Sequence, residues 1–325
     1  LAGADVPLRL VGVSNSTRMR MDPSGLDTSA SPELLLKDGQ PADLDALITW
    51  LVERPGRRVL VDCTASDIVP DRYAELLRAG VGVVTPNKRA NTRDQETFAD
   101  LAKLSRRTPF LYETTVGAAL PLVGTLRDVV ASGDPVSRIE GVFSGTLAYV
   151  LGQVTEGAAF SAAVVDARAR GFTEPDPRDD LSGLDVARKL LTLARVAGFE
   201  AELSDVSVDA LYPPDWADLS VGAFMERLPE LDADWERRRS ELPPAHRLSY
   251  LARLDATGNA LSLQTGVEAA SPDTVFGRLT GMDNALALTT RRYPRALTVS
   301  GPGAGHDITA SGVYADLLHA ARCLL

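Results

Sequence analysis

The chain has 325 residues, a hydrophobic fraction of 45% and a formal net charge of −10. This length suffices for two globular domains, and the negative charge argues against nucleic acid or an anionic membrane surface as a partner. No apolar run approaches the ~18 residues of a membrane-spanning helix, no secretory signal is visible, and the two cysteines, Cys63 and Cys323, indicate a reducing compartment. We therefore expect a cytoplasmic globular protein without a membrane partner, and three scattered histidines argue against a zinc site.

Apolar runs alternate with helical segments in the first part of the chain. Such alternation predicts a doubly wound α/β sheet, in which ligands bind beyond the carboxyl ends of the strands. That rule places Thr64, Ser66 and Lys88 at the functional edge, although a plain helix N-cap also explains Thr64 and Ser66. The predicted elements are strands at 8–13, 58–63 and 81–85, the first of them buried and parallel, and helices at 43–53 and 71–79.

The remainder of the sequence predicts a second sheet. We expect a helix to open within 113–120 and to continue through Val130, and the run Ser144-Gly145-Thr146 to lead into another helix. The turn GPGAG at 301–305 contains glycines that let the backbone approach a ligand closely. Other predicted elements are strands at 137–143, 247–255, 260–267 and 295–300, and helices at 222–240 and from Thr309.

An acidic loop followed by an amphipathic helix occupies 171–197. Pro175 and Pro177 keep the loop out of a helix, and Asp179 or Asp180 is placed to cap the helix that follows. Leucines at helical spacing give that helix an apolar face.

Asp185 and Lys189 lie four residues apart on this predicted helix, so their side chains stack one above the other. Several carboxylates of the preceding loop are close in sequence to this single lysine. Such a set can hold an ammonium group and deliver a proton beside it. The alternative is a solvated surface pair preceded by acidic helix caps, which contributes only a few tenths of a kcal/mol.

The same stretch resembles the substrate-binding segment of homoserine dehydrogenase, in particular the form fused to an aspartate kinase. The match is carried by the runs Glu174-Pro175-Asp176-Pro177-Arg178-Asp179-Asp180-Leu181 and Gly183-Leu184-Asp185-Val186-Ala187-Arg188-Lys189. Further family-like segments lie at 63–66, 85–88, 113–120 and 301–310, so the resemblance covers nearly the whole chain.

This resemblance implies a domain arrangement and partners. A Rossmann-like dinucleotide-binding domain would comprise 1–118 and 288–325, and an α+β domain for substrate binding and dimerisation would comprise 119–287. It also implies a homodimer or a higher homo-oligomer, and an aspartate kinase domain upstream in the same polypeptide.

The resemblance further implies roles for individual residues. Lys189 would be the principal proton donor, with Lys88 as its partner at the same centre. Substrate would be bound by Glu174, Asp180, Asp185, Gly145 and Thr146. The cofactor, NADP or NAD, would be met by Thr64, Ser66, Lys88, Gly171 and Gly305. Arg18 follows the first predicted strand, where it could meet a 2′-phosphate of the cofactor, but an ordinary surface arginine explains it equally well. A monovalent cation, sodium or potassium, would be held by the Glu113 carboxylate and the carbonyls of Val116, Ala118 and Leu120; a helix entry without an ion is the alternative there.

The sequence departs from the family pattern at two places. The glycine-rich dinucleotide fingerprint that should precede Leu8 is not in the chain, so we expect a strand, a glycine-rich loop and a helix to lie directly upstream of Leu1. Phe172 stands where many relatives carry a tyrosine, which removes one hydroxyl contact to substrate.

The implied reaction is the reversible, NAD(P)H-dependent reduction of L-aspartate 4-semialdehyde to L-homoserine, a step toward threonine and methionine. Two alternatives stay open: a catalytically silent regulatory or scaffold fragment of a larger enzyme, which the missing glycine loop favours, and an oxidoreductase of another amino-acid aldehyde.

Overall fold

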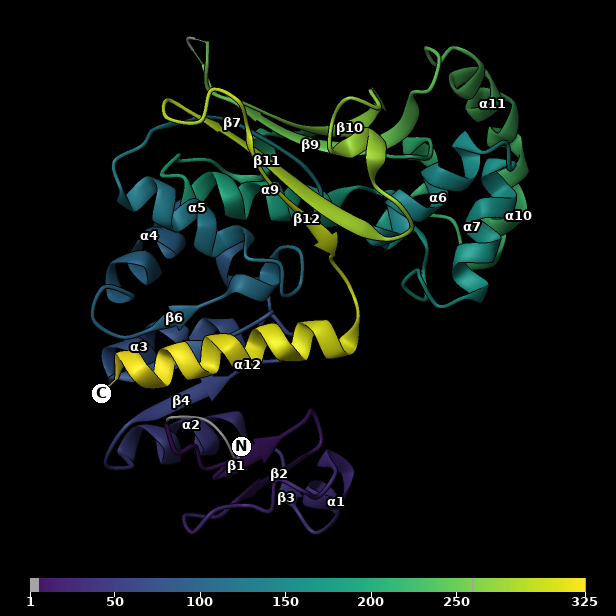
Figure 1. Ribbon diagram of the computed structural model, residues 1–325. Coiled ribbons are helices and arrows are strands. Elements are labelled where there is room, and N and C mark those ends of the chain that lie inside the picture. Colours follow the sequence, from purple (N-terminus) through teal and green to yellow (C-terminus); the bar gives the residue numbers. More distant parts are fainter. Residues whose placement is uncertain (1–5, 259, 325) are drawn as a thin grey trace. The chain divides into compact units, whose positions relative to one another are not determined.

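The computed structural model describes residues 6–258 and 260–324 (Figure 1). The chain divides into two compact units. Unit 1 comprises 1–90, 96–112 and 313–325, and unit 2 comprises 91–95 and 113–312. No helix in the described part of the chain is long and apolar enough to cross a membrane.

A parallel sheet forms the centre of unit 1, and the predicted α/β class is confirmed. Its strand order is β4-β5-β6, and Val81, Val83 and Val84 of the middle strand are fully buried. The last helix joins this unit from Val313 onward and packs Val313 and Ala320 near Val84. The elements that lie wholly or partly in this unit are β4 (Arg58–Val61), β5 (Val81–Val84), β6 (Phe110–Leu111), α2 (Leu44–Glu53), η1 (Val69–Arg72), α3 (Tyr73–Arg78), η2 (Ala90–Thr92), α4 (Gln95–Leu104) and α12 (His306–Cys323).

The first predicted strand is wrong in its pairing. Residues 8–13 do not form a buried parallel strand; instead β1 (Gly12–Ser14) pairs antiparallel with β2 (Arg18–Met21) in a separate sheet. The turn explains the pairing, because the Asn15 side chain accepts hydrogen bonds from the N–H groups of Thr17 and Arg18 and so reverses the chain. This sheet is completed by β3 (Gln40–Pro41), and α1 (Pro32–Lys37) contacts β1 and β2.

Unit 2 contains a six-stranded sheet with the order β12-β11-β7-β9-β10-β8. Its neighbouring strands run antiparallel except for the parallel pair β8 and β10. Helices α6 (Gly145–Thr155) and α9 (Leu184–Val196) pack against β9, whose Tyr250, Ala252 and Leu254 are at most 1% exposed. The strands are β7 (Val136–Val142), β8 (Val206–Val208), β9 (Arg247–Asp255), β10 (Ser262–Ala270), β11 (Asp283–Thr290) and β12 (Leu297–Pro302).

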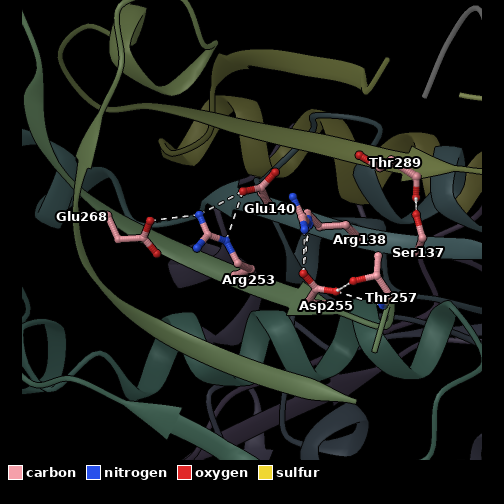
Figure 2. A network of polar contacts seen from close by, with 8 residues as sticks. All are labelled: Ser137, Arg138, Glu140, Arg253, Asp255, Thr257, Glu268 and Thr289. Atoms are coloured by element: carbon pink, nitrogen blue, oxygen red, sulfur yellow. Dashed lines mark hydrogen bonds and ion pairs between the residues drawn. The ribbon is translucent and has the colours of Figure 1, made fainter. Parts of the chain in front are cut away.

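Charged side chains occupy the other face of the same sheet (Figure 2). Arg138 of β7 is paired with Asp255 of β9 at 2.8 Å, and Arg253 bridges Glu140 and Glu268 at 3.0 and 2.9 Å. Glu140 lies opposite Arg253 in the ladder, so the pattern of alternating side chains gives this face a cross-strand ion network.

The chain passes between the two units at other residues than the expected domain boundaries at 118/119 and 287/288. Residues 288–312 lie in unit 2, because β12 pairs with β11 in the six-stranded sheet. Residues 113–118 also belong to unit 2.

The helix expected to open within 113–120 begins only at Leu122. Gly117 and Ala118 have φ values of +74° and +53°, which a right-handed helix cannot contain, and Pro121 stands at the helix start. The segment instead forms η3 (Glu113–Thr115), a loop and α5 (Leu122–Ala131).

The helix that carries Asp185 and Lys189 also begins later than predicted. Asp179 and Asp180 are not its caps; they lie in the short helix α8 (Arg178–Leu181), and α9 (Leu184–Val196) starts after Gly183. Gly183 has a φ of +73°, and a Cβ there would lie 1.9 Å from the Tyr250 hydroxyl. The predicted helix at 222–240 is divided into α10 and α11 by the short η6, which begins at Leu228.

The remaining elements are α6 (Gly145–Thr155), α7 (Phe160–Ala169), η4 (Leu203–Asp205), η5 (Pro214–Trp216), α10 (Val221–Arg227), η6 (Leu228–Leu231), α11 (Asp232–Ser240) and η7 (Phe276–Arg278).

Gly183→Ala should destabilise the protein more than Gly198→Ala does. Both glycines have positive φ, so both variants carry a backbone cost of roughly 1–2 kcal/mol. Only at position 183 must the new methyl group displace a buried side chain, because nothing lies within 4 Å of a Cβ at Gly198. Urea unfolding of both variants measures the difference, and equal losses of unfolding free energy would contradict the packing argument.

Candidate active site

Lys189 is held at the meeting point of α9 and the end of β7. Its Nζ donates to the Phe143 carbonyl at 2.6 Å and lies 2.7 Å from a carboxylate oxygen of Asp185, one helical turn before it. The predicted i,i+4 pair is therefore present. The side chain of Lys189 is only 14% exposed, which differs from the solvated surface pair that was the alternative.

The acidic loop is organised around Asp180. Its Oδ2 accepts the Glu174 N–H at 2.8 Å. The Thr146 hydroxyl donates to the Phe172 carbonyl at 2.5 Å, so Thr146 joins the N-terminal turn of α6 to the start of the loop. Gly145 precedes it, capped by Ser144, whose Oγ accepts the Leu147 N–H.

Burial raises the pKa of Asp180 above its usual range, and the neighbouring charges of Glu174 and Asp185 act in the same direction. The Glu174 N–H and the Thr146 hydroxyl oppose this shift. A cluster of carboxylates that repel one another is a place where a ligand cation is favoured.

Asp176 does not contribute to this cluster. It forms an ion pair with Arg178 at 2.6 Å, and Arg178 in turn donates to the carbonyls of Ala217 and Leu219. This arginine therefore connects the loop to the segment before α10, and Asp176 has a structural role.

The two glycines of unit 2 that were predicted to meet the cofactor lie on loops, with free space around their Cα atoms. Gly171 and Gly305 have φ values of +71° and +118°, and nothing stands within 4 Å of a Cβ built at Gly171. Gly303 allows close packing on Asn284, because a Cβ there would lie 2.2 Å from the amide carbon of that side chain.

The loop predicted to hold a cation is strained. Ala118 adopts a left-handed conformation although it is not glycine, and Val116 is fully buried. The Glu113 carboxylate accepts the N–H groups of Val123 and Gly124 at 2.7 and 2.6 Å and thus caps α5. Leu120 closes the loop by donating its N–H to the Gly117 carbonyl.

Within unit 1, Thr64, Ser66 and Lys88 follow the carboxyl ends of β4 and β5, as predicted. Thr64 is exposed, and Ser66 and Lys88 are half-buried. Arg18 lies on β2, where its guanidinium donates to the Gly39 carbonyl at 2.7 Å. That bond fixes Arg18 against the turn before β3.

Two partners of these residues were missed by sequence reasoning. The Phe143 carbonyl could not be found, because backbone acceptors leave no signal in side-chain identity. Asp62 could have been found, since an acidic residue ends the apolar strand Arg58–Val61 immediately before Thr64.

Comparison with known proteins decides the family. A model described as "Homoserine dehydrogenase" matches residues 121–318, and one described as "Homoserine dehydrogenase, NAD binding domain" matches residues 1–112. A homoserine dehydrogenase of Paracoccidioides brasiliensis is 39% identical over 288 residues, which cover 84% of this chain and 77% of that protein. The chain belongs to the homoserine dehydrogenase family.

Other members of the homoserine dehydrogenase family extend the comparison. A chloroplastic bifunctional aspartokinase/homoserine dehydrogenase of Zea mays is 42% identical over 327 residues; the match covers 98% of this chain but only 35% of that relative. Among solved structures, a Candida auris protein described as of unknown function has a TM-score of 0.89 at 35% identity, covering 98% of this chain and 92% of that one. A hyperthermophilic archaeal homoserine dehydrogenase in complex with NADPH shares the fold, with a TM-score of 0.73 at 21% identity and coverage of 96% and 88%.

The donor set of unit 1 fits the dinucleotide that the homoserine dehydrogenase NAD-binding domain implies. Hydroxyls of Thr64 and Ser66 and the ammonium of Lys88 can donate to amide and phosphate oxygens. Their loop is held internally, since the Ser66 N–H donates to Thr64 Oγ1 and the Ile68 N–H donates to Ser66 Oγ.

Asp180→Asn should leave the ligand-free protein at least as stable as the wild type at neutral pH. The raised pKa of Asp180 means that ionising this carboxyl costs folding stability as pH rises from about 3.9 to the raised value, and the cost persists above it. Asparagine cannot ionise, so the thermal midpoint of the variant should exceed that of the wild type at pH 8, and the difference should vanish near pH 3. If the thermal midpoint of the variant relative to that of the wild type is lower at pH 8 than at pH 3, the pKa of Asp180 is not raised.

Proposed function

We propose that the chain catalyses the reversible reduction of L-aspartate 4-semialdehyde to L-homoserine with NAD(P)H. The main support for this proposal is the ion pair of Lys189 and Asp185 beside the acidic loop, in a chain of the homoserine dehydrogenase family. The cofactor, when bound, supplies the hydride, and the protein must supply a proton to the oxygen of the reduced carbonyl.

Lys189 is suited to that task. An ammonium stabilises negative charge that develops on oxygen and can also transfer the proton. Asp185 and the Phe143 carbonyl keep this ammonium in one position, 2.7 and 2.6 Å from their oxygens, so that its direction is set before substrate arrives. Lys88 is assigned as the partner lysine, on the loop after β5.

The acidic loop is assigned to the substrate's own ammonium group. Glu174 is exposed and Asp180 half-buried, and the backbone N–H of Glu174 fixes the relative position of the two residues. Gly145 and Thr146 border the loop and complete the substrate site, while Gly171 and Gly305 offer open backbone to the cofactor.

Lys189→Ala should lower kcat by at least ~10², the low end for loss of a general acid. The exposed Lys103 on α4 is the control, and Lys103→Ala should leave kcat unchanged. NADPH oxidation with aspartate 4-semialdehyde measures both variants, after circular dichroism shows that each is folded. If Lys189→Ala keeps more than about half the turnover, the lysine is only structural. If the wild type reduces other amino-acid aldehydes in preference to aspartate semialdehyde, the chain is a different oxidoreductase. If the wild type is inactive, the chain is a catalytically silent fragment.

The loop around Ala118 supports a site for sodium or potassium. Ala118 has a φ of +53°, which interrupts helical hydrogen bonding at this loop, and we assign the carbonyls of Val116, Ala118 and Leu120 as ligands because all-oxygen sets suit hard cations. The Leu120 carbonyl also accepts the Leu122 N–H at 2.8 Å. Glu113 would complete the set while it caps α5.

Sodium or potassium should therefore raise the thermal midpoint of the protein, because an ion that binds only the folded state stabilises it. Choline chloride at equal ionic strength is the control. Glu113→Gln should remove the difference between the salts, whereas an equal response to all three salts would exclude the cation site.

The wider assignments rest on the same relatives. From the family resemblance we propose that the protein forms a homodimer or a higher homo-oligomer. The bifunctional relatives support an aspartokinase domain in the same polypeptide. A role in threonine and methionine synthesis is proposed from the reaction assigned to the chain. Exposed Cys63 and Cys323 agree with a cytoplasmic location.

A further inference from the structure

A buried carboxylate lies at the end of β4, directly before the loop assigned to the cofactor. Asp62 is 3% exposed, and the side chains around it belong to Tyr73, Thr85 and Asn87, which are 0%, 0% and 5% exposed. A buried carboxylate is costly unless hydrogen bonds satisfy it.

Three neutral groups donate to this carboxylate. The Thr64 N–H reaches Oδ1 at 2.8 Å, and the Tyr73 hydroxyl and the Asn87 amide reach Oδ2 at 2.5 and 3.3 Å. Burial raises the pKa of Tyr73, and the Asp62 charge adds to this effect, so the phenol keeps the proton that it donates.

The same residues tie together the loops that follow two neighbouring parallel strands. The Asn87 amide also donates to the Ser66 carbonyl at 2.8 Å, and the Thr85 hydroxyl donates to the Asp62 carbonyl at 2.8 Å. An ion pair of Arg89 and Asp67 at 3.5 Å joins the loops a second time, closer to the surface.

We propose that Asp62 is a positioning residue for the cofactor, acting through Thr64 on its own loop and through Asn87 on the loop of Lys88. This proposal rests on the proposed function. One side chain sets both loops, because Val61 and Val84 are paired in the ladder and the chain continues from them into Asp62 and Thr85.

The chemistry requires a carboxylate at this position. Its two oxygens only accept hydrogen bonds, and all three of its partners are donors. An asparagine has the same shape but would direct its NH₂ group at one of those donors. The mismatch should move Thr64 or Asn87 and, through them, Ser66 and Lys88.

The decisive experiment compares Asp62→Asn and Tyr73→Phe with Leu76→Ala in the intact protein. Leu76 is fully buried in α3 of the same unit but outside the network, so its truncation reports loss of stability alone. Calorimetric titration gives the Kd for NADPH, steady-state kinetics give kcat and the KM for aspartate semialdehyde, and all measurements are made well below the thermal midpoints.

Asp62→Asn should raise the Kd for NADPH at least about tenfold, the effect of losing a hydrogen bond to a charged group, and should lower kcat. Its KM for aspartate semialdehyde at saturating NADPH should stay unchanged, because the substrate residues lie in unit 2. Tyr73→Phe should raise the Kd at least about threefold, and Leu76→Ala should change only the thermal midpoint.

The proposal is overturned if Asp62→Asn lowers the thermal midpoint but leaves Kd and kcat within about twofold of wild type. Should Asp62→Asn not fold, Tyr73→Phe decides: an unchanged Kd in that variant rejects the proposal. The wild type tests the proposed function separately, since a protein that neither binds NADPH nor reduces aspartate semialdehyde refutes that function whatever Asp62 does.

Discussion

The arrangement of the candidate site depends on the ammonium of Lys189. A lysine side chain that is only 14% exposed must have its charge compensated, because burying an unpaired ion costs several kcal/mol. Asp185 and the Phe143 carbonyl provide that compensation from α9 and from the end of β7. Any change that shifts the helix along the strand breaks one of the two contacts, so the charge fixes the register of helix on sheet.

The start of α9 is set by sterics in the same region. Gly183 lets the chain pass the Tyr250 hydroxyl and turn from α8 into α9, and it thereby decides where on the helix Asp185 and Lys189 fall. The acidic loop before α8 is fixed at its two ends, by Thr146 on the Phe172 carbonyl and by Arg178 on the segment before α10. The carboxylates thus converge on a helix whose position is independently determined, which is how a site gains fixed geometry from flexible side chains.

Local patterns allowed much of this arrangement to be predicted. The elements α2, β4 and β5 follow from apolar periodicity and capping, and the Asp185–Lys189 pair follows from helical spacing alone. The late start of α9 could not be predicted, because Gly183 is constrained by Tyr250, which is distant in sequence.

The other differences have similar causes. The antiparallel pairing of β1 depends on the Asn15 turn rather than on the apolar run that suggested a parallel strand. The place of β12 depends on its partner strand β11, which apolar periodicity does not specify. The residue types of the candidate site follow from local signals, whereas the contacts among these residues depend on pairings between distant segments.

In the proposed reaction, Lys189 gives a proton to the substrate oxygen while the acidic loop binds the substrate ammonium. A crystal structure of the intact protein with NADP and L-homoserine would show both contacts. We expect Lys189 Nζ within hydrogen-bond distance, ~3 Å, of the homoserine hydroxyl, and the substrate ammonium among Glu174, Asp180 and Asp185. A homoserine bound with its hydroxyl away from Lys189, or with its ammonium outside the acidic loop, would refute these roles.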